Sequence, residues 1–530
     1  MNRERTLNTI GFALLAACFI VALVRVFNRN TEETQPGTIT IRFAHWQLES
    51  GLRDAFDEVA RRYMEAHPGI RVEQLAIPER TYAQYYRTQL IGGTAPDIFA
   101  IGFGNNDEIL ARFFTPLTPW LERPNPFNVG TELEGIPWRD TFIDGLNSKY
   151  NQNLLDYYMI STAMFTVRVY YNKTLWQEIL GDAPVPETYE DFRLACEKIR
   201  DFARDTGRGI LPIASSKFNG PQLMDKLFEG QTQKLRLSLD PVHVLNTGNV
   251  DVVIPYLKGE WSMETPAIRS AVELSHEVAG FMTPGFSQLG REDAAFYFVQ
   301  NRAVMIVSGS WDATSLRSQA PFEIGVFAVP LPSRDHPTYG RFTLGRASEG
   351  DTSTEGSFGI VRQSPHFEVA LDFLQYLTSQ PGNQVYADES GWLPAIIGVT
   401  PDPLIEPFMP VIDGELRGFF LKFNDIGANT KGLYENAISL LERRDGVESY
   451  IRTMTSRLPE AIREDLDLRV KNNKHNTIRQ DTTIAALRSL DRLGDRTTDY
   501  AAKLTEVLEA QNGQEGETYR IEQELRFLQK

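Results

Sequence analysis

Near its start the chain alternates between strand-like and helix-like hydrophobic patterns, and this alternation limits the folds open to it. Thr38 to Ala44 places apolar side chains at every second position, as in a strand with one buried face. After Ser50, a predicted helix cap, apolar residues recur at three- and four-residue steps until Pro68-Gly69 ends the helix. Next come a strand at Ile70 to Leu75, a helix at Thr81 to Ile91 and a buried strand at Pro96 to Ile101. This β-α-β-α-β order predicts an α/β domain.

The same alternation returns further along the chain. Val167 to Tyr171 is a predicted strand, and Thr188 with Asp191 forms a capping box for a helix that carries Cys196 on its apolar face. We therefore expect Cys196 to be a core residue rather than a reactive thiol. Further predicted elements are strands at Ala303 to Val307, Ile324 to Val329 and Phe358 to Val361, and a helix at Phe367 to Leu377.

Beyond Gly432 the strand patterns disappear and helical spacing continues to Lys530. Gly513 and Gly516 are expected to interrupt this region before a short last helix at Tyr519 to Leu528. The sequence thus predicts an α-helical extension at the carboxyl end.

Charge and cysteine content exclude several classes of protein. Lys and Arg number 54 against 70 Asp and Glu, which gives a net charge of −16. Such a chain is not a general nucleic-acid binder held by phosphate contacts. Its two cysteines are Cys18 and Cys196, and Cys18 lies in the first apolar segment. On this ground we do not expect an internal disulfide, and one remaining thiol cannot form a cysteine-rich zinc site.

The amino-terminal segment predicts export from the cytoplasm. Arg3 and Arg5 precede Ile10 to Val24, which contains no charge and belongs to an apolar segment of about 15 to 18 residues. Three fates remain open: an uncleaved membrane anchor, which we favour, lipidation at Cys18 within Leu15-Ala16-Ala17-Cys18, and ordinary cleavage. We expect a periplasmic protein tethered to the cytoplasmic membrane.

The sequence carries no recognisable catalytic or cofactor motif. It contains no phosphate-binding Gly-rich loop and no Gly-x-Ser-x-Gly turn, and His276-Glu277 lacks the second histidine of a zinc helix. We therefore assign no catalytic residue, no metal and no cofactor. A glycan hydrolase that uses some of the many carboxylates is the least favoured alternative.

Three tryptophans follow predicted strands or turns and are the best candidates for a ligand site. They are Trp46 after the first strand, Trp311 after Gly309-Ser310, and Trp392 after Gly391. In α/β folds ligands bind at the carboxyl ends of strands. Sugars bind flat aromatic rings through their C–H faces and polar side chains through their hydroxyls. The alternative for each tryptophan is core packing.

In the order and spacing of its motifs the chain resembles the extracellular solute-binding proteins of family 1, the sugar-binding receptors of ABC importers. The resemblance covers roughly residues 38–400. Its motifs are Ile39 to Trp46, Ala95 to Phe99, Val169 to Leu175, Pro186 to Phe192, Ala303 to Trp311, Ile324 to Val326, Gly359 to Val361 and Gly391 to Ala395. Asn172 and Lys173 belong to these motifs, and we expect them to complete the fold at a strand–helix junction.

The resemblance implies an α/β, type II periplasmic-binding-protein-like fold with two discontinuous lobes, a membrane anchor and a helical extension. The expected parts are a signal or anchor segment with linker at 1–37, lobe one at 38–160 and 325–358, lobe two at 161–324 and 359–450, and the extension at 451–530. The ligand would bind between the lobes and be enclosed by hinge closure.

The function implied is a carbohydrate receptor that delivers its ligand to the permease of an ABC importer. The ligand-binding residues expected are Trp46, Gln47, Glu49, Asp97 and Phe103 from lobe one, Trp311 and Asp312 from lobe two, and Trp392. The alternative is a membrane-tethered sensor or scaffold on the same fold, with the helical extension as its partner surface.

Overall fold

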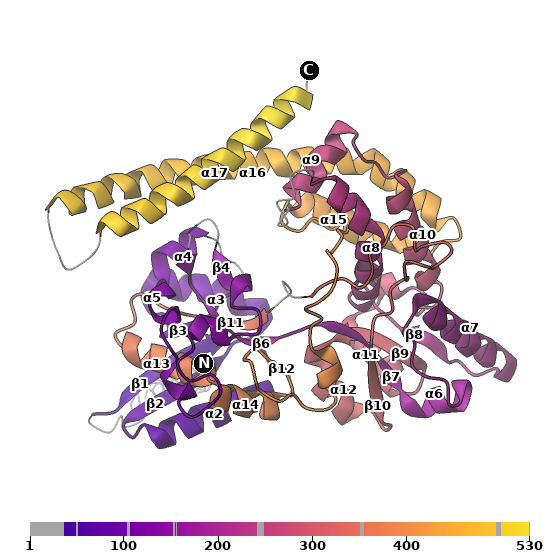
Figure 1. The fold of residues 1–530 in the computed structure, drawn as a ribbon, viewed down its shortest axis with the longest axis horizontal. Helices are drawn as coiled ribbons and strands as arrows, with labels where there is room; N and C mark the ends of the chain where they lie inside the picture. The colour runs from indigo at the N-terminus through magenta and orange to yellow at the C-terminus, as the bar shows by residue number, and fades with distance from the viewer. Residues whose placement is uncertain are drawn as a thin grey trace, which may run out of the picture.

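The structure is a computed structural model. It describes residues 37–48, 51–102, 107–151, 154, 156–240, 248–349, 354–493 and 500–528. Two α/β lobes lie side by side, and a long helical hairpin extends from the second lobe (Figure 1). The two-lobed arrangement and the helical extension confirm these parts of the expected fold. The proposed anchor and Cys18 fall outside the described residues, and no helix within them is long and apolar enough to cross a membrane.

Lobe one is built on a six-stranded sheet. Its strands, in spatial order, are β12 (Leu393–Pro394), β6 (Ile160–Met164), β11 (Thr354–Ile360), β3 (Ile98–Ala100), β1 (Ile39–His45) and β2 (Ile70–Ala76). Strand β1 runs parallel to β2 and β3, whereas β11 runs antiparallel to β3 and β6. The helices of this lobe are α2 (Leu52–Ala66), α3 (Glu79–Gly92), α4 (Asp107–Phe113), α5 (Thr118–Leu121), α13 (Phe367–Leu377) and α14 (Gln380–Ser390). A short hairpin of β4 (Tyr150–Asn151) and β5 (Asp156–Tyr157) completes it.

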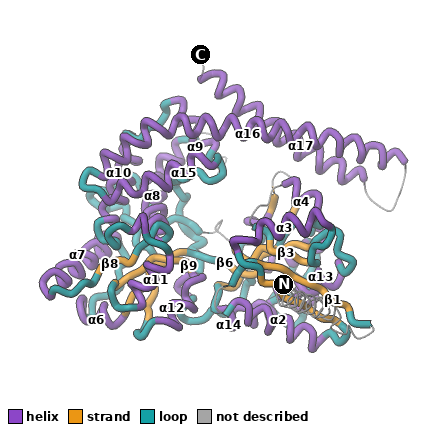
Figure 2. Tube along the Cα trace, turned by 180° about the vertical axis from the view of Figure 1, so that it is seen from behind, coloured by secondary structure: helices purple, strands orange, loops and turns teal. Residues whose placement is uncertain are grey.

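Lobe two contains a four-stranded sheet flanked by helices. Its strands, in spatial order, are β10 (Ile324–Ala328), β7 (Val167–Asn172), β9 (Ala303–Gly309) and β8 (Leu211–Ala214). The helices are α6 (Lys173–Leu180), α7 (Tyr189–Thr206), α8 (Asn219–Ser238), α9 (Val250–Lys258), α10 (Pro266–Ala279), α11 (Arg291–Val299) and α12 (Ala313–Gln319). Figure 2 shows the strands of this sheet among the helices of the lobe.

Two local predictions for lobe two are confirmed in atomic detail. The Thr188 side chain accepts a hydrogen bond from the Asp191 N–H at 3.2 Å and so caps α7, on which Cys196 is fully buried. Asn172 caps α6 in the same way, since its side chain accepts from the Leu175 N–H at 3.0 Å. Both caps supply partners for amide groups that a helix leaves unpaired at its start.

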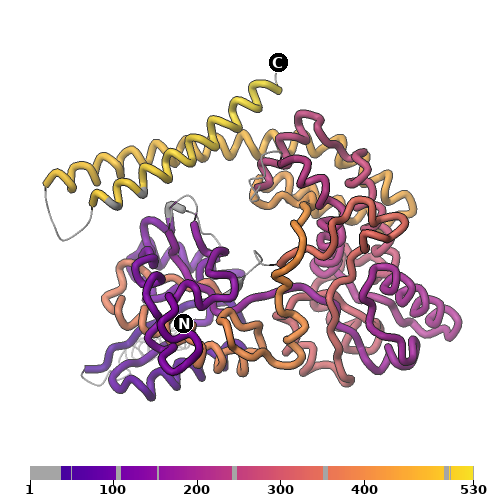
Figure 3. The backbone as a smooth tube through the Cα atoms, in the orientation of Figure 1, coloured from indigo at the N-terminus to yellow at the C-terminus, as the bar shows by residue number. Residues whose placement is uncertain are grey.

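Three segments cross between the lobes. The first crossing, residues 165–166, joins β6 to β7; the second, described over residues 329–349, leads from β10 toward β11; the third, residues 395–427, leads from β12 to α15 (Ala428–Ala437). Figure 3 shows the first and third crossings running between the lobes. They meet where Thr166 Oγ1 donates to the Phe408 carbonyl at 2.5 Å.

The expected lobe boundaries need correction. Residues 359–400 were expected in lobe two, yet α13, α14 and β12 belong with the sheet and core of lobe one. Strand β6 also pairs in the sheet of lobe one, and β10 pairs with β7 in lobe two. The reason is that β11 and β12 pair with β6, so the second crossing returns the chain to lobe one before the third crossing leaves it again.

The carboxyl-terminal helices are partly core and partly projecting. Helix α16 (Gly446–Leu493) buries Met454, Leu458 and Ile462 in the core of lobe two, so this core continues beyond the boundary expected at residue 450. Helix α17 (Tyr500–Leu528) packs along α16. It is continuous through both glycines that were expected to break it, so that prediction is wrong.

Candidate functional site

The candidate site lies where the carboxyl ends of the lobe-one strands and the end of β9 approach the crossings. In lobe one, Tyr82 links the ends of β1 and β3, because its hydroxyl lies 3.2 Å from the Ala44 carbonyl and 2.6 Å from the Ala100 carbonyl. In lobe two, Gly309 at the end of β9 pairs with Val167 at the start of β7. The strand ends of the second sheet therefore stand directly beside the first crossing.

Trp311 stands at the junction of the two lobes. It lies in a short 3-10 turn after β9 and packs against residues of both hydrophobic clusters. Its ring meets Phe165 of the first crossing edge-on, with centroids 5.1 Å apart, and Phe218 at 6.2 Å. The side chain is half-buried, and its indole N–H has no hydrogen-bond partner. A half-buried aromatic ring whose buried donor has no partner thus stands beside the crossing.

Asp312 is held in place by neighbouring side chains of lobe two. One carboxylate oxygen is ion-paired with Arg291, and the other accepts a hydrogen bond from Ser308. The Arg291 guanidinium lies over the Phe218 ring, 5.2 Å from its centroid. These contacts form a charged and aromatic surround for Trp311. Whether Asp312 itself contacts a ligand stays a prediction.

Trp46 and Gln47 follow β1 in lobe one. Trp46 is half-buried, meets Tyr82 edge-on at 5.0 Å and lies close against Gly102, where a Cβ would come within 2.5 Å of its ring. Gln47 is buried, with 3% of its surface exposed, and neither its amide nitrogen nor its amide oxygen has a partner. A buried unpaired polar group costs about 1–3 kcal/mol. Both polar atoms of the Gln47 amide are therefore buried without a hydrogen bond, and a ligand contact by Gln47 stays a prediction.

His45 lies beside these residues and is uncharged at neutral pH. Burial lowers the pKa of His45 to about 4, in spite of the hydrogen bond between its Nε2 and Gln74. Its Nδ1 has no partner. The polar atoms of His45 and Gln47 at this end of β1 are therefore buried and neutral.

Trp392 belongs to the lobe-one side of the contact between lobes. It is 5% exposed, packs in the core of lobe one and has an unpaired indole N–H. The preceding turn touches α12 of lobe two, because Thr314 Oγ1 donates to the Ser390 carbonyl at 3.2 Å. This carbonyl also lies against Gly51, which comes five residues after Trp46 in the sequence. The structure thus brings the Trp392 turn close to both lobe two and the residues after β1.

Asp97 lies apart from this group. It precedes β3, at the amino end of the strand, whereas Trp46 follows the carboxyl end of the parallel strand β1. Its carboxylate accepts hydrogen bonds from the backbone N–H of Arg42 at 2.8 Å and from the Ser364 hydroxyl at 2.6 Å. These bonds give it a structural role at the opposite end of the strands from Trp46. Glu49 and Phe103, the other two lobe-one candidates, lie outside the described residues.

Phe165, Phe218 and Arg291 surround Trp311 but were not identified from the sequence. They come from the first crossing, the turn after β8 and the start of α11. Only the three-dimensional pairing of β7, β8 and β9 brings these segments together. Among the residues that the structure describes, no group of three or more His, Cys, Asp or Glu side chains could hold a metal ion.

Comparison with known proteins identifies the family. The profile described as bacterial extracellular solute-binding protein matches residues 49–384. This chain belongs to that family. The solute-binding protein is 23% identical to the multiple sugar-binding protein of Streptococcus mutans over 402 residues, which is 74% of this chain and 84% of the relative.

Solved structures show the same fold as this solute-binding protein. The apo form of RafE from Streptococcus pneumoniae superposes with a TM-score of 0.57 and 17% identity, covering 80% of this chain and 98% of RafE. The GacH receptor of Streptomyces glaucescens superposes with a TM-score of 0.56 and 14% identity, covering 80% and 99%. The part of the chain outside these matches is about one fifth, which is consistent with an added helical hairpin.

Proposed function

We propose that this protein is the extracytoplasmic receptor of an ABC importer and that it binds a carbohydrate between its lobes without transforming it. The observation that carries the proposal is the set of buried, unpaired polar atoms on Gln47, Trp311 and Trp392. A sugar offers C–H faces to aromatic rings and hydroxyls that both donate and accept hydrogen bonds. It therefore matches two indole N–H donors and one amide better than a charged solute does.

Known relatives support a carbohydrate ligand. The Streptococcus mutans relative is named a multiple sugar-binding protein, RafE has been solved in complex with raffinose, and GacH in complex with acarbose. Family membership supports the extracytoplasmic location and the role as a binding protein rather than an enzyme. Tethering by the amino-terminal segment and delivery to a membrane permease are parts of the same proposal.

A ligand screen by thermal unfolding tests the proposal. The purified protein is heated with raffinose, maltotriose and acarbose, and with an amino acid and a polyamine as solutes of other classes. A ligand at 100 times its dissociation constant stabilises the folded state by about 2.7 kcal/mol. We expect a rise in melting temperature with at least one carbohydrate. Stabilisation by the amino acid or the polyamine alone would refute the carbohydrate assignment.

Trp311→Ala localises the binding site once a sugar has been found. By comparison with base stacking on aromatic rings, stacking contributes about 1–3 kcal/mol, so affinity should fall by roughly 5- to 150-fold. Trp138→Ala is the matched control, because Trp138 is a fully buried core residue of lobe one whose indole N–H donates to Thr378. It should lower the free energy of unfolding by about 3–5 kcal/mol and leave the affinity of the folded protein unchanged.

The projecting hairpin favours a second role as a sensor or scaffold. Its distal part leaves Ile478 67% exposed and Leu493 79% exposed. Pull-down of membrane proteins with the full chain and with a chain lacking residues 471–530 would compare the two roles. A permease retained by both chains supports the importer receptor, and a different protein retained by the full chain alone supports the sensor.

A further inference from the structure

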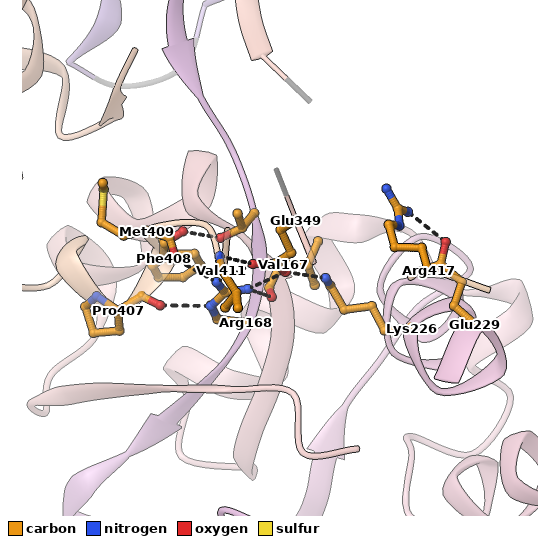
Figure 4. A network of polar contacts seen from close by, with 11 residues as sticks. Val167, Arg168, Lys226, Glu229, Glu349, Pro407, Phe408, Met409, Val411 and Arg417 are labelled. Carbon is orange, nitrogen blue, oxygen red and sulfur yellow. Dashed lines mark hydrogen bonds and ion pairs between the residues drawn. The ribbon is translucent and has the colours of Figure 1, made fainter. Parts of the chain in front are cut away.

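One polar network fastens all three crossings at their lobe-two ends. Its centre is Arg168, the second residue of β7, and its other charged members are Glu349 of the second crossing and Lys226 of α8 (Figure 4). The Arg168 side chain is 2% exposed and that of Glu349 is 10% exposed. The two residues are 181 positions apart in the sequence, so their pairing exists only because the crossings come together.

The Arg168 guanidinium uses every one of its five N–H groups. Two of them donate to the two carboxylate oxygens of Glu349 at 2.9 and 2.8 Å, a bidentate pair. The other three donate to carbonyls, at 2.8 Å to Pro407, 3.0 Å to Met409 and 2.9 Å to Val167. One side chain therefore binds a carboxylate of the second crossing and two carbonyls of the third, and it stands two residues after the first.

Glu349 completes the connection from its side. It accepts from Lys226 at 2.7 Å, and its backbone N–H donates to the Val411 carbonyl at 2.6 Å. Burial opposes its ionisation, but the hydrogen bonds from Arg168 and the charge of Lys226 hold the pKa of Glu349 at about 2. The carboxylate is therefore ionised throughout the neutral range, and the pair stays charged.

The second and third crossings are also bonded to each other. The Ser348 N–H donates to the Glu415 carbonyl at 2.8 Å, and the Glu415 N–H donates to the Arg346 carbonyl at 2.7 Å. Gln233 of α8 then fixes both segments to lobe two, since its amide nitrogen lies 3.0 Å from the Gly345 carbonyl and 2.8 Å from the Leu416 carbonyl. The lobe-two ends of the crossings thus form one bonded unit.

A buried ion pair contributes little net stability to a fold, but it can fix the relative position of the segments that it joins. Taking two charges out of water costs several kcal/mol for each ion, and apolar residues of similar size often stabilise a fold equally well. The Arg168 guanidinium, a planar fork of five N–H donors, adds geometric specificity. Its donors can bind five acceptors in only one relative arrangement. The network is therefore suited to holding three chain segments in one relative position.

We propose that Arg168 and Glu349 form a hinge lock, which holds the lobe-two ends of the three crossings together and so fixes the separation of the lobes when no ligand is bound. Both are positioning residues. The lock goes beyond the proposed function, since it concerns the separation of the lobes and not which ligand they bind.

The test measures the separation of the lobes without any ligand, so it is independent of the carbohydrate assignment. In the full chain with Cys18→Ser, spin labels are placed at Ile91→Cys on lobe one and Leu194→Cys on lobe two, sites that are 76% and 41% exposed. Pulsed electron paramagnetic resonance then gives the distribution of distances between the two spin labels. We expect one narrow peak in this parent protein and loss of that peak in Glu349→Gln and in Arg168→Lys, which keeps the charge but not the fork.

Two further variants make the result decisive. Glu323→Gln removes an ion pair with Lys173 in which the glutamate is 75% exposed, and it should leave the distribution unchanged. Because an unpaired buried charge can prevent folding, Arg168→Met with Glu349→Leu is measured as well, and it should also lose the narrow peak. A parent-like narrow peak in the folded lock variants, or in this double variant if the single variants do not fold, would overturn the proposal.

Discussion

Replacing Leu458 by alanine tests whether the first part of α16 is core or appendage. The Leu458 side chain is fully buried and shares the lobe-two cluster with Met454 and Ile462. Burial of each methylene contributes about 0.8 kcal/mol, and the cavity left behind adds to the loss. We therefore expect the free energy of unfolding to fall by about 2–5 kcal/mol, the range for a buried Leu→Ala change.

The matched control is Leu468→Ala, ten residues further along the same helix. Leu468 is 53% exposed, so its truncation should change the free energy of unfolding by no more than about 0.5 kcal/mol. Both variants and the parent are unfolded in urea and followed by far-ultraviolet circular dichroism. Equal midpoints for the two variants would show that α16 is not part of the lobe-two core, and the reasoning from burial would fail.

Two further changes test the site and the core separately. A Cβ at Gly309 would lie 2.3 Å from the Trp311 ring, so Gly309→Ala should displace the indole and weaken sugar binding, measured by calorimetry, while Gly325→Ala, which meets Tyr171 instead, should not. Burial raises the pKa of Asp225 to about 7, in spite of the hydrogen bond from Tyr434. The unfolded state releases this proton near pH 4 and the folded state near pH 7, so this group stabilises the fold below about pH 4 and that contribution is lost between pH 4 and 7. Urea titrations should show this loss in the parent and a smaller one in Asp225→Asn.

Local patterns in the sequence predicted individual elements well. The helix Phe367–Leu377 has the bounds expected from its periodicity, and Thr188 caps α7 as its spacing with Asp191 indicated. Such signals depend on residues three or four positions apart, whose interactions are settled within one helix. The burial of Cys196 followed for the same reason.

Predictions that depended on pairing between distant segments were less accurate. No local pattern near residues 359–400 indicates that β11 pairs with β6. This segment was therefore expected in lobe two instead of lobe one. Asp97 was expected in the ligand site and within a strand at Pro96 to Ile101, yet it stands before β3, at the amino end of the strand. In α17, Gly513 and Gly516 each disfavour helix by about 1 kcal/mol, but packing along α16 outweighs that cost. The ring of contacts around Trp311 also depends on sheet order, which periodicity does not encode.

The hairpin of α16 and α17 amplifies any movement of lobe two. Ion pairs Lys258–Glu524 and Arg520–Asp251 fasten its base to α9. Residues 471–493 extend beyond it by about 35 Å, at 1.5 Å per residue. For a lever of that length, each ten degrees of rotation displaces the far end by about 6 Å. A change in the angle between the lobes therefore produces its largest displacement, relative to lobe one, at the end of α16 near Leu493.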